Sequence, residues 1–271
     1  MCGTCGCGEA GVRVTELGTA GPAHGHGHGH APGHGHAPGE GHAPGAGRVV
    51  ALEEDILGAN DALAAENRRV LAERGVLAVN LMSSPGSGKT TLLVRTLTDI
   101  GDELGMSVVE GDQETLLDAE RIGATGARVV QVNTGAGCHL DATMLARAMA
   151  ALAPAPGSVM VVENVGNLVC PALFDLGEAA RVVVMSVTEG ADKPLKYPHM
   201  FRTADLVLLN KVDLLPYVDF DVATWTAAVE RVRPGVEVLS VSATRGDGLD
   251  TWYAWLRAGI ASRRGGTATS E

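Results

Sequence analysis

The sequence lacks long apolar runs, an excess of positive charge and a cysteine framework. No stretch of about 18 consecutive apolar residues is present, so no membrane-spanning helix is predicted. The first residues also lack a basic segment followed by an apolar one, and we therefore expect no secretory signal. Five cysteines, an odd number in a chain of 271 residues, do not predict a set of disulfides.

Acidic residues outnumber basic ones. The chain has 32 Asp and Glu against 21 Lys and Arg, which gives a formal net charge of −11. This balance argues against a surface for nucleic acid or for an anionic membrane. Without a disulfide framework or a secretory signal, we expect a cytoplasmic protein. In that reducing compartment, clustered thiols more often bind metal or do redox work than form disulfides.

Residues 1–47 differ in composition from the rest of the chain. They hold 15 of the 36 glycines and few aliphatic residues, so we expect a disordered tail. We divide the tail into a Cys-rich motif (1–11) and a His/Gly-rich segment (12–47). The remainder is predicted to be one nucleotide-binding domain (48–262) and a flexible C-terminal tail (263–271).

Both parts of the N-terminal tail carry metal ligands. Cys2, Cys5 and Cys7 lie within "MCGTCGC", and removal of Met1 would add the amine of Cys2 to three thiolates. Such an N/S set suits square-planar Ni²⁺; zinc binding and a redox pair are the alternatives. Seven histidines follow, and we expect them to store nickel rather than to act as a solvated spacer. They are His24, His26, His28, His30, His34, His36 and His42.

The body of the chain alternates apolar strand-like runs with helical segments. This alternation predicts an α/β fold with a mostly parallel sheet flanked by helices. A helical pattern ends at Gly75 and precedes the first run. The strand-like runs occupy residues 76–82, 107–111, 127–133, 158–164, 181–187, 205–210 and 236–243.

The stretch "SSPGSGKTT" (83–91) lies between a predicted strand and a predicted helix, the context that a phosphate-binding P-loop requires. The first glycine of the usual pattern is replaced by Ser83. Lys89 would reach the phosphates, and Thr90 would bind Mg²⁺. The residues expected to contact phosphate are Gly86, Ser87, Gly88, Lys89, Thr90 and Thr91.

A second motif predicts guanine rather than adenine as the base. Asn210, Lys211 and Asp213 end a strand-like run as Asn-Lys-x-Asp. The Asp213 carboxylate would accept from N1–H and from the exocyclic amine of guanine, and adenine offers no such pair of donors. After the next run, the backbone of Ser242 and Ala243 would contact the guanine O6 atom.

Two carboxylates follow strands near the P-loop. Asp112 ends "VVEGD", and Glu163 lies three residues before Gly166. Either carboxylate would hold Mg²⁺ or orient the attacking water. We therefore expect Lys89, Asp112 and Glu163 to serve hydrolysis; the alternative role for each carboxylate is a helix cap or a solvated turn.

Cys138, His139 and Cys170 form a further candidate metal site. Both cysteines follow predicted strands and should lie at the carboxyl edge of the sheet. Two thiolates and one imidazole suit Zn²⁺ or Ni²⁺. The alternative is that the cysteines are small buried apolar residues.

Taken together, these motifs resemble the hydrogenase nickel-incorporation GTPases, the HypB family of SIMIBI-class P-loop GTPases. The resemblance covers about residues 50–258 and includes "SSPGSGKTTLL", "QVNTGAGCHLDA", "ENVGNLVCPALFDLGE" and "LLNKVDLLPY". The tail is similar as well, because "MCGTCGCG" fits the Cys-x-x-Cys-Gly-Cys nickel motif of some members.

The resemblance implies a GTP-hydrolysing nickel metallochaperone for [NiFe]-hydrogenase, with GTP, Mg²⁺, Ni²⁺ and Zn²⁺ as ligands. It implies a homodimer promoted by nucleotide or metal, and it favours Cys138, His139 and Cys170 as a Ni²⁺/Zn²⁺ site. The implied partners are a small nickel- and zinc-binding accessory protein and the hydrogenase large subunit. Two alternatives are a nickel/zinc storage protein and a urease-accessory GTPase, although the latter group typically carries Cys-Pro-His where this chain has Cys170-Pro171-Ala172.

Overall fold

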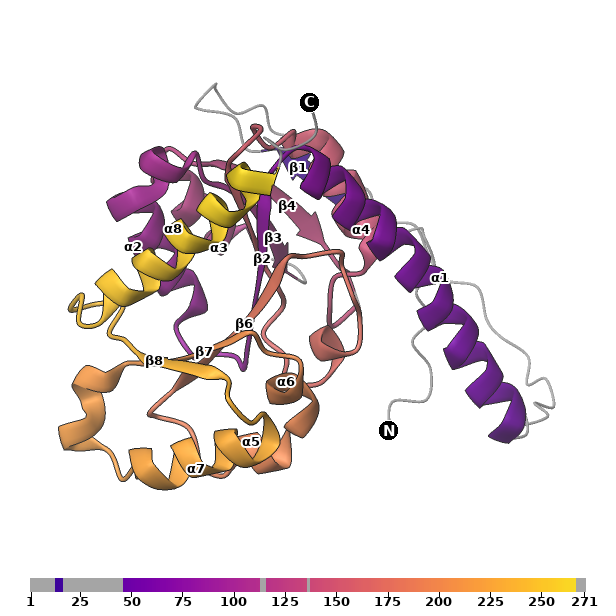
Figure 1. Cartoon of the computed structure of the whole chain (residues 1–271). Helices are drawn as coiled ribbons and strands as arrows, with labels where there is room; N and C mark the ends of the chain where they lie inside the picture. The colour runs from indigo at the N-terminus through magenta and orange to yellow at the C-terminus, as the bar shows by residue number, and fades with distance from the viewer. Residues whose placement is uncertain (1–12, 17–45, 113–115, 136, 267–271) are drawn as a thin grey trace, which may run out of the picture.

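Seven apolar runs form the parallel strands of one sheet in the computed structural model (Figure 1). The structure describes residues 13–16, 46–112, 116–135 and 137–266. The seven strands match the predicted runs to within a few residues. They are β2 (Leu77–Ser83), β3 (Ser107–Asp112), β4 (Arg128–Asn133), β5 (Val159–Glu163), β6 (Ala180–Ser186), β7 (Leu206–Asn210) and β8 (Glu237–Ser240).

An eighth strand, β1 (Arg13–Glu16), pairs antiparallel with β4, so the full strand order is β1-β4-β3-β5-β2-β6-β7-β8. This strand differs from the prediction that residues 12–47 lack structure. Backbone hydrogen bonds to the exposed edge of β4 hold these residues, and such pairing requires no apolar pattern in the sequence.

Helices cover both faces of the sheet. On one face α2 (Lys89–Leu104), α3 (Leu117–Gly123) and α8 (Leu249–Gly266) pack on β2, β3 and β5, and on the other α1 (Ala46–Glu73) and α4 (Ala142–Leu152) pack on β3 and β4 (Figure 1). The remaining helical segments lie near β6 and β7. They are η2 (Cys170–Ala172), α5 (Lys193–Lys196), α6 (Pro198–Arg202), η3 (Val212–Tyr217) and α7 (Val222–Val232).

The central strands are apolar because each is covered on both faces. Every residue of β2, β5 and β7 is buried. The helices at both ends extend past the predicted domain limits, since α1 begins at Ala46 and α8 continues to Gly266. Among the described helices, none combines the length and the apolar character that a bilayer crossing requires.

Polar contacts hold α1 on the body. Asn67 donates to the carbonyls of Ala142 (2.8 Å) and Leu176 (3.0 Å), and Arg68 pairs with Asp175 at 2.7 Å. These contacts fix α1 to the start of α4 and to the 175–178 loop.

Candidate functional site

The P-loop connects β2 to α2 at the carboxyl edge of the sheet. Gly88 caps α2 with a φ of 93°, a left-handed conformation that favours glycine. A Cβ at this position would lie 2.6 Å from the Asn210 amide nitrogen, so the close approach also requires glycine. The first N–H groups of α2 have no partner within the helix and suit a phosphate.

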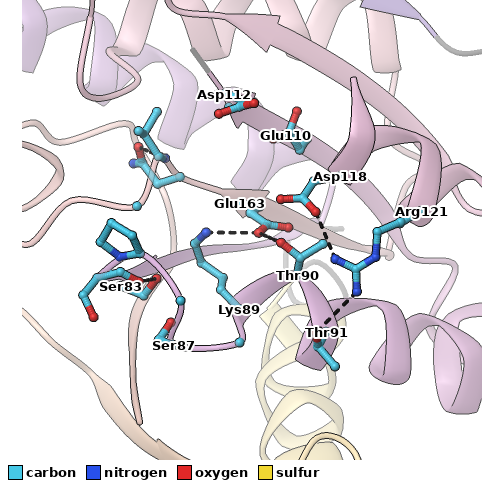
Figure 2. A pocket seen from close by; sticks show the side chains of 18 of the residues that line it. Ser83, Ser87, Lys89, Thr90, Thr91, Glu110, Asp112, Asp118, Arg121 and Glu163 are labelled. Carbon is cyan, nitrogen blue, oxygen red and sulfur yellow. Dashed lines mark hydrogen bonds and ion pairs between the residues drawn. The ribbon is translucent and has the colours of Figure 1, made fainter. Parts of the chain in front are cut away.

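A cavity of about 570 Å³ lies in front of this loop (Figure 2). It is lined by the whole P-loop, by the carboxylates of Glu110, Asp112 and Glu163, and by residues of α3. The predicted phosphate-binding residues from Gly86 to Thr91 are therefore brought together with both predicted carboxylates. The volume suits a ligand of nucleotide size.

Glu163 contacts both functional side chains of the P-loop. Its Oε1 atom accepts from Thr90 Oγ1 at 2.6 Å and from Lys89 Nζ at 3.0 Å (Figure 2). Its Oε2 atom is buried and has no protein partner among the described residues. Such a carboxylate oxygen, beside a threonine hydroxyl, is an available ligand for a hard cation.

Glu110 is a further buried carboxyl of the cavity. It lies opposite Glu163 in the register of β3 and β5, and its Oε2 atom also has no partner in the described part of the chain. Burial, followed by the charges of Glu163, Asp112 and Asp118, raises the pKa of Glu110 to about 8, although Lys89 acts in the opposite direction. Glu110 is thus held mainly as the neutral acid at pH 7, and a cation bound beside it would favour the ionised carboxylate.

A smaller cavity of about 240 Å³ adjoins the first and contains the predicted base-binding motif. Asn210 donates to the Ser87 carbonyl at 2.9 Å, and Lys211 Nζ donates to the Gly86 carbonyl at 2.7 Å. Asp213 lines the same cavity. The motif thus braces the P-loop and presents a carboxylate beside it.

The two backbone amides that are predicted to contact guanine, those of Ser242 and Ala243, have protein partners in this structure. The Ser242 amide donates to the Asp247 carbonyl at 2.9 Å, and the Ala243 amide donates to Asn210 Oδ1 at 3.2 Å. The Ser242 hydroxyl donates to Asp213 Oδ1 at 2.6 Å. In this structure Ser242 therefore positions the carboxylate, while Ala243 lines the smaller cavity.

The three predicted body ligands come together. The ligand atoms of Cys138, His139 and Cys170 all lie within 4.8 Å of one another. Cys138 Sγ is 2.8 Å from Cys170 Sγ and 3.6 Å from His139 Nδ1. These distances, with two half-buried thiols and one buried imidazole, fit a soft metal ion.

The environment of His139 favours the neutral ring that a metal requires. Burial lowers its pKa from the ordinary value, although Asp141 acts in the opposite direction. Phe174 stacks on the imidazole with ring centroids 3.9 Å apart. The ring is thus held in position beside Cys138.

The segment of residues 163–170 connects the two sites. Glu163 contacts the P-loop at its start, and Cys170 belongs to the thiol–imidazole cluster at its end. Between them, a Cβ on Gly166 would lie 3.2 Å from Pro85, and Asn167 donates to the Cys138 carbonyl at 3.4 Å.

Several site residues have no signal in the sequence. Arg121 reaches from α3 to Thr91 (3.3 Å) and to Asp118 (3.0 Å) at the rim of the cavity. Glu189 accepts from the hydroxyl of Ser84 in the P-loop and from Lys193. The tail ligands Cys2, Cys5 and Cys7 and the seven predicted storage histidines lie outside the described residues.

Comparison with known proteins decides the family. Residues 77–240 match the family described as "CobW/HypB/UreG, nucleotide-binding domain". The hydrogenase maturation factor HypB of Rhizobium leguminosarum bv. viciae is 58% identical over 210 residues, covering 78% of this chain and 70% of that protein. The protein of the same name from Escherichia coli K12 is 55% identical over 202 residues, covering 74% and 70%.

The chain belongs to the HypB family.

Solved HypB structures share the fold. The HypB crystal structure from Archaeoglobus fulgidus matches with a TM-score of 0.71 and 40% identity, over 75% of this chain and all of that one. The HypB structure from Helicobacter pylori, solved in complex with nickel, matches with a TM-score of 0.70 and 36% identity, over 78% and 98%.

Proposed function

We propose that this HypB-family chain is a GTP-hydrolysing metallochaperone that delivers Ni²⁺ to [NiFe]-hydrogenase during its maturation. The observation that carries the proposal is the single segment, residues 163–170, that contributes Glu163 to the nucleotide cavity and Cys170 to the thiol–imidazole cluster. One short segment can thus respond to nucleotide and hold metal.

The smaller cavity supports guanine as the base. The Asp213 carboxylate accepts from Ser242 and retains lone pairs for two further donors, which guanine supplies along its N1–H and exocyclic amine edge. A ribose-triphosphate would then extend across Gly88 into the larger cavity, because Gly88 lines both.

The residues present fit Mg²⁺. The Glu163 Oε2 atom, the Thr90 hydroxyl and the Asp112 carboxylate would hold the ion, and the buried Glu110 carboxyl lies nearby. When bound, Mg²⁺ would offset the negative charge of the phosphates.

The chain's own groups perform the remaining steps of hydrolysis. Lys89 and the N–H groups at the start of α2 would bind the phosphates and offset the charge that develops on them. Asp112, at the end of β3 on the cavity wall, is the proposed residue that orients the attacking water. Displacement of Lys89 from Glu163 toward phosphate would alter the start of the 163–170 segment.

The cluster would carry Ni²⁺ as cargo and would also accept Zn²⁺. Cys138, His139 and Cys170 provide three soft ligands and leave a position for a fourth ligand from a second copy or a partner. A homodimer, a small nickel- and zinc-binding accessory protein and the hydrogenase large subunit are the proposed partners, in the cytoplasm. The tail thiols and histidines would store nickel.

The HypB relative from Helicobacter pylori, 39% identical over 193 residues, is described as a hydrogenase/urease maturation factor. Urease maturation is therefore the second candidate function. Hydrogenase and urease activities, measured in a strain that lacks the gene, distinguish the two candidates.

The proposal is tested with two variants that each disable one site. Lys89→Ala should abolish phosphate release from GTP and leave nickel binding at the cluster intact. Cys138→Ala should do the reverse. Each variant, returned to the deletion strain, should leave [NiFe]-hydrogenase without nickel, measured by enzyme activity and by metal content.

Full hydrogenase activity in both complemented strains would overturn the proposed function. If hydrogenase activity is lost with Cys138→Ala but not with Lys89→Ala, the role in nickel delivery stands and GTP hydrolysis is not required for it.

A further inference from the structure

Asn164 lies between the two sites: it is among the residues that line the larger cavity, and its side chain contacts Leu140 beside the thiol–imidazole cluster. It follows Glu163 at the end of β5 and is 1% exposed. An amide side chain that is this deeply buried needs partners for its polar atoms, because an unpaired buried group is costly. The hydrogen-bond partners of its side chain therefore identify the segments that Asn164 connects.

The side-chain oxygen of Asn164 joins two backbone segments. It accepts from the Leu140 amide at 3.2 Å and from the Val165 amide at 3.0 Å. Leu140 directly follows His139, a member of the cluster. Val165 begins the loop that runs past Pro85 of the P-loop to Cys170. One oxygen atom thus holds the cluster loop and the loop from the nucleotide cavity against each other.

The side-chain nitrogen of Asn164 joins the same point to the sheet. It donates to Asn80 Oδ1 at 3.3 Å, and Asn80 Nδ2 donates to Glu178 Oε1 at 3.3 Å. Asn80 lies fully buried in β2, three residues before Ser83 and the P-loop. Glu178 in turn accepts from the Leu176 amide at 2.8 Å, in the loop that follows Phe174.

We infer that Asn164 is the positioning residue that couples the nucleotide cavity to the thiol–imidazole cluster. The inference rests on the proposed function, since it requires that both sites bind their ligands. Asn80 serves as the fixed end of the linkage, because every residue of its strand is buried. Leu140 is the other end: its side chain is also buried, but its backbone belongs to the loop between β4 and α4 that carries Cys138 and His139.

The coupling follows from the geometry. A nucleotide that draws Glu163 or Gly166 toward the phosphates displaces Val165 and Asn164 with them. The Leu140 amide must then follow, or remain buried without an acceptor. When it follows, Cys138 and His139 change position relative to Cys170, and the nickel affinity changes. By reciprocity, nickel changes the nucleotide affinity by the same factor.

The experiment compares nickel affinities in two nucleotide states. The full chain carries Cys2→Ser, Cys5→Ser and Cys7→Ser, which leaves Cys138 and Cys170 as its cysteines. Ni²⁺ is titrated in the presence of Mg²⁺ with either GDP or a non-hydrolysable GTP analogue. Binding is followed by the thiolate-to-nickel absorption band, to which the tail histidines do not contribute.

In this parent protein we expect the two nickel dissociation constants to differ by roughly 5-fold to 150-fold. Asn164→Ala should bring their ratio close to one, while nucleotide and nickel each still bind. Asn164→Asp retains an acceptor for both amides, so it should keep most of the ratio even though it loses the donor to Asn80 and adds an acidic group at a buried position. If Asn164→Ala does not fold, Asn164→Ser replaces it, because a serine is too short to reach Leu140.

Asn67→Ala is the matched control. Asn67 is also buried and donates two side-chain hydrogen bonds, to the carbonyls of Ala142 and Leu176. Its loss should lower the free energy of unfolding and leave the ratio of nickel affinities unchanged. A residue with only a structural role would behave as this control does.

Two results would overturn the inference. An Asn164→Ala protein that keeps the parent's ratio removes Asn164 from the coupling and leaves the proposed function standing. If the parent protein binds nickel equally well with GDP and with the GTP analogue, the two sites are not coupled and Asn164 cannot couple them. Phosphate release from GTP and nickel binding, each measured alone, then report separately on the proposed function.

Discussion

Asp213 is the residue proposed to recognise the base. Ser242 fixes its carboxylate through a hydrogen bond of 2.6 Å, and Asn210 and Lys211 of the same motif hold the P-loop. Orientation of the carboxylate and orientation of the phosphate loop therefore depend on one short stretch after β7. A change confined to the carboxylate should alter base preference without altering the loop.

We predict that Asp213→Asn weakens GTP binding by at least about 10-fold, because two charge-assisted hydrogen bonds to guanine are lost. Binding of xanthosine triphosphate should improve, since the amide can donate to the oxygen that replaces the amine of guanine. Competition against a fluorescent GTP analogue measures both. Unchanged GTP affinity would contradict a role for Asp213 in base recognition.

The carboxylate of Asp175 leads to a prediction about how the stability of the fold depends on pH. Burial alone would raise the pKa of Asp175, but hydrogen bonds from Arg68 and from the Gly177 amide outweigh burial and hold it below its ordinary value. A lowered folded pKa contributes stability above the unfolded value of about 3.9, and the contribution is lost as pH falls through the folded pKa.

Asp175→Asn should therefore cost about 1 kcal/mol of unfolding free energy at pH 7, and the cost should shrink as the pH falls below about 4. Urea unfolding of both proteins across this range measures the difference. A difference that stays constant with pH would show that the charge of Asp175 is not the cause.

At the scale of elements, α1 depends on a glycine in the loop beneath it. Gly177 has a φ of 89°, and a Cβ there would lie 2.3 Å from the Ala64 carbonyl oxygen and 2.7 Å from Asn67 Cβ. The backbone of the 175–178 loop thus approaches α1 more closely than any side chain would permit.

Gly177→Ala should destabilise the fold by about 3 kcal/mol or more, from left-handed strain and from displacement of α1. Gly126→Ala is the control, since Gly126 has a nearly equal φ of 88° and no described atom lies within 4 Å of the position that its methyl group would take. It should cost only about 1–2 kcal/mol. Equal losses in the two variants, measured by denaturant unfolding, would contradict the close packing of α1.

The sequence predicted the parallel strands and brought together most of the residues that line the two cavities, because both have local patterns. Buried parallel strands are apolar runs, and the P-loop and Asn-Lys-x-Asp motifs are contiguous. The Asn164 linkage was not predictable, because its partners Leu140 and Asn80 lie 24 and 84 residues away. Likewise, Arg121 reaches Thr91 only through the packing of α3 on α2.

At the scale of the whole molecule, both candidate sites lie along one edge of the sheet while the core lies behind them. In the described part of the chain, the core consists of apolar clusters on the strands and their covering helices, without a contribution from Cys138 or Cys170. Ligands should therefore stabilise the fold by mass action and should not be needed to form it.

We predict that Mg²⁺–GDP at about 100 times its dissociation constant adds about 2.7 kcal/mol to the free energy of unfolding. In Lys89→Ala, most of this GDP-dependent gain in unfolding free energy should be lost. Removal of nickel by a chelator should leave the protein folded. Thermal unfolding at increasing GDP concentrations measures this. A midpoint that does not depend on GDP concentration would contradict nucleotide binding in the cavity.

Strand β1 has a practical consequence for shortened proteins. It pairs with the outer edge of β4, which would otherwise present unpaired backbone groups to solvent. A protein shortened to begin at α1, made to study the thiol–imidazole cluster without the N-terminal tail, would lack β1. The edge of β4 would then be free to pair with a strand of another copy. Self-association of such a trimmed protein would then imitate a metal-driven dimer, so nickel titrations are better made on chains that retain Arg13–Glu16.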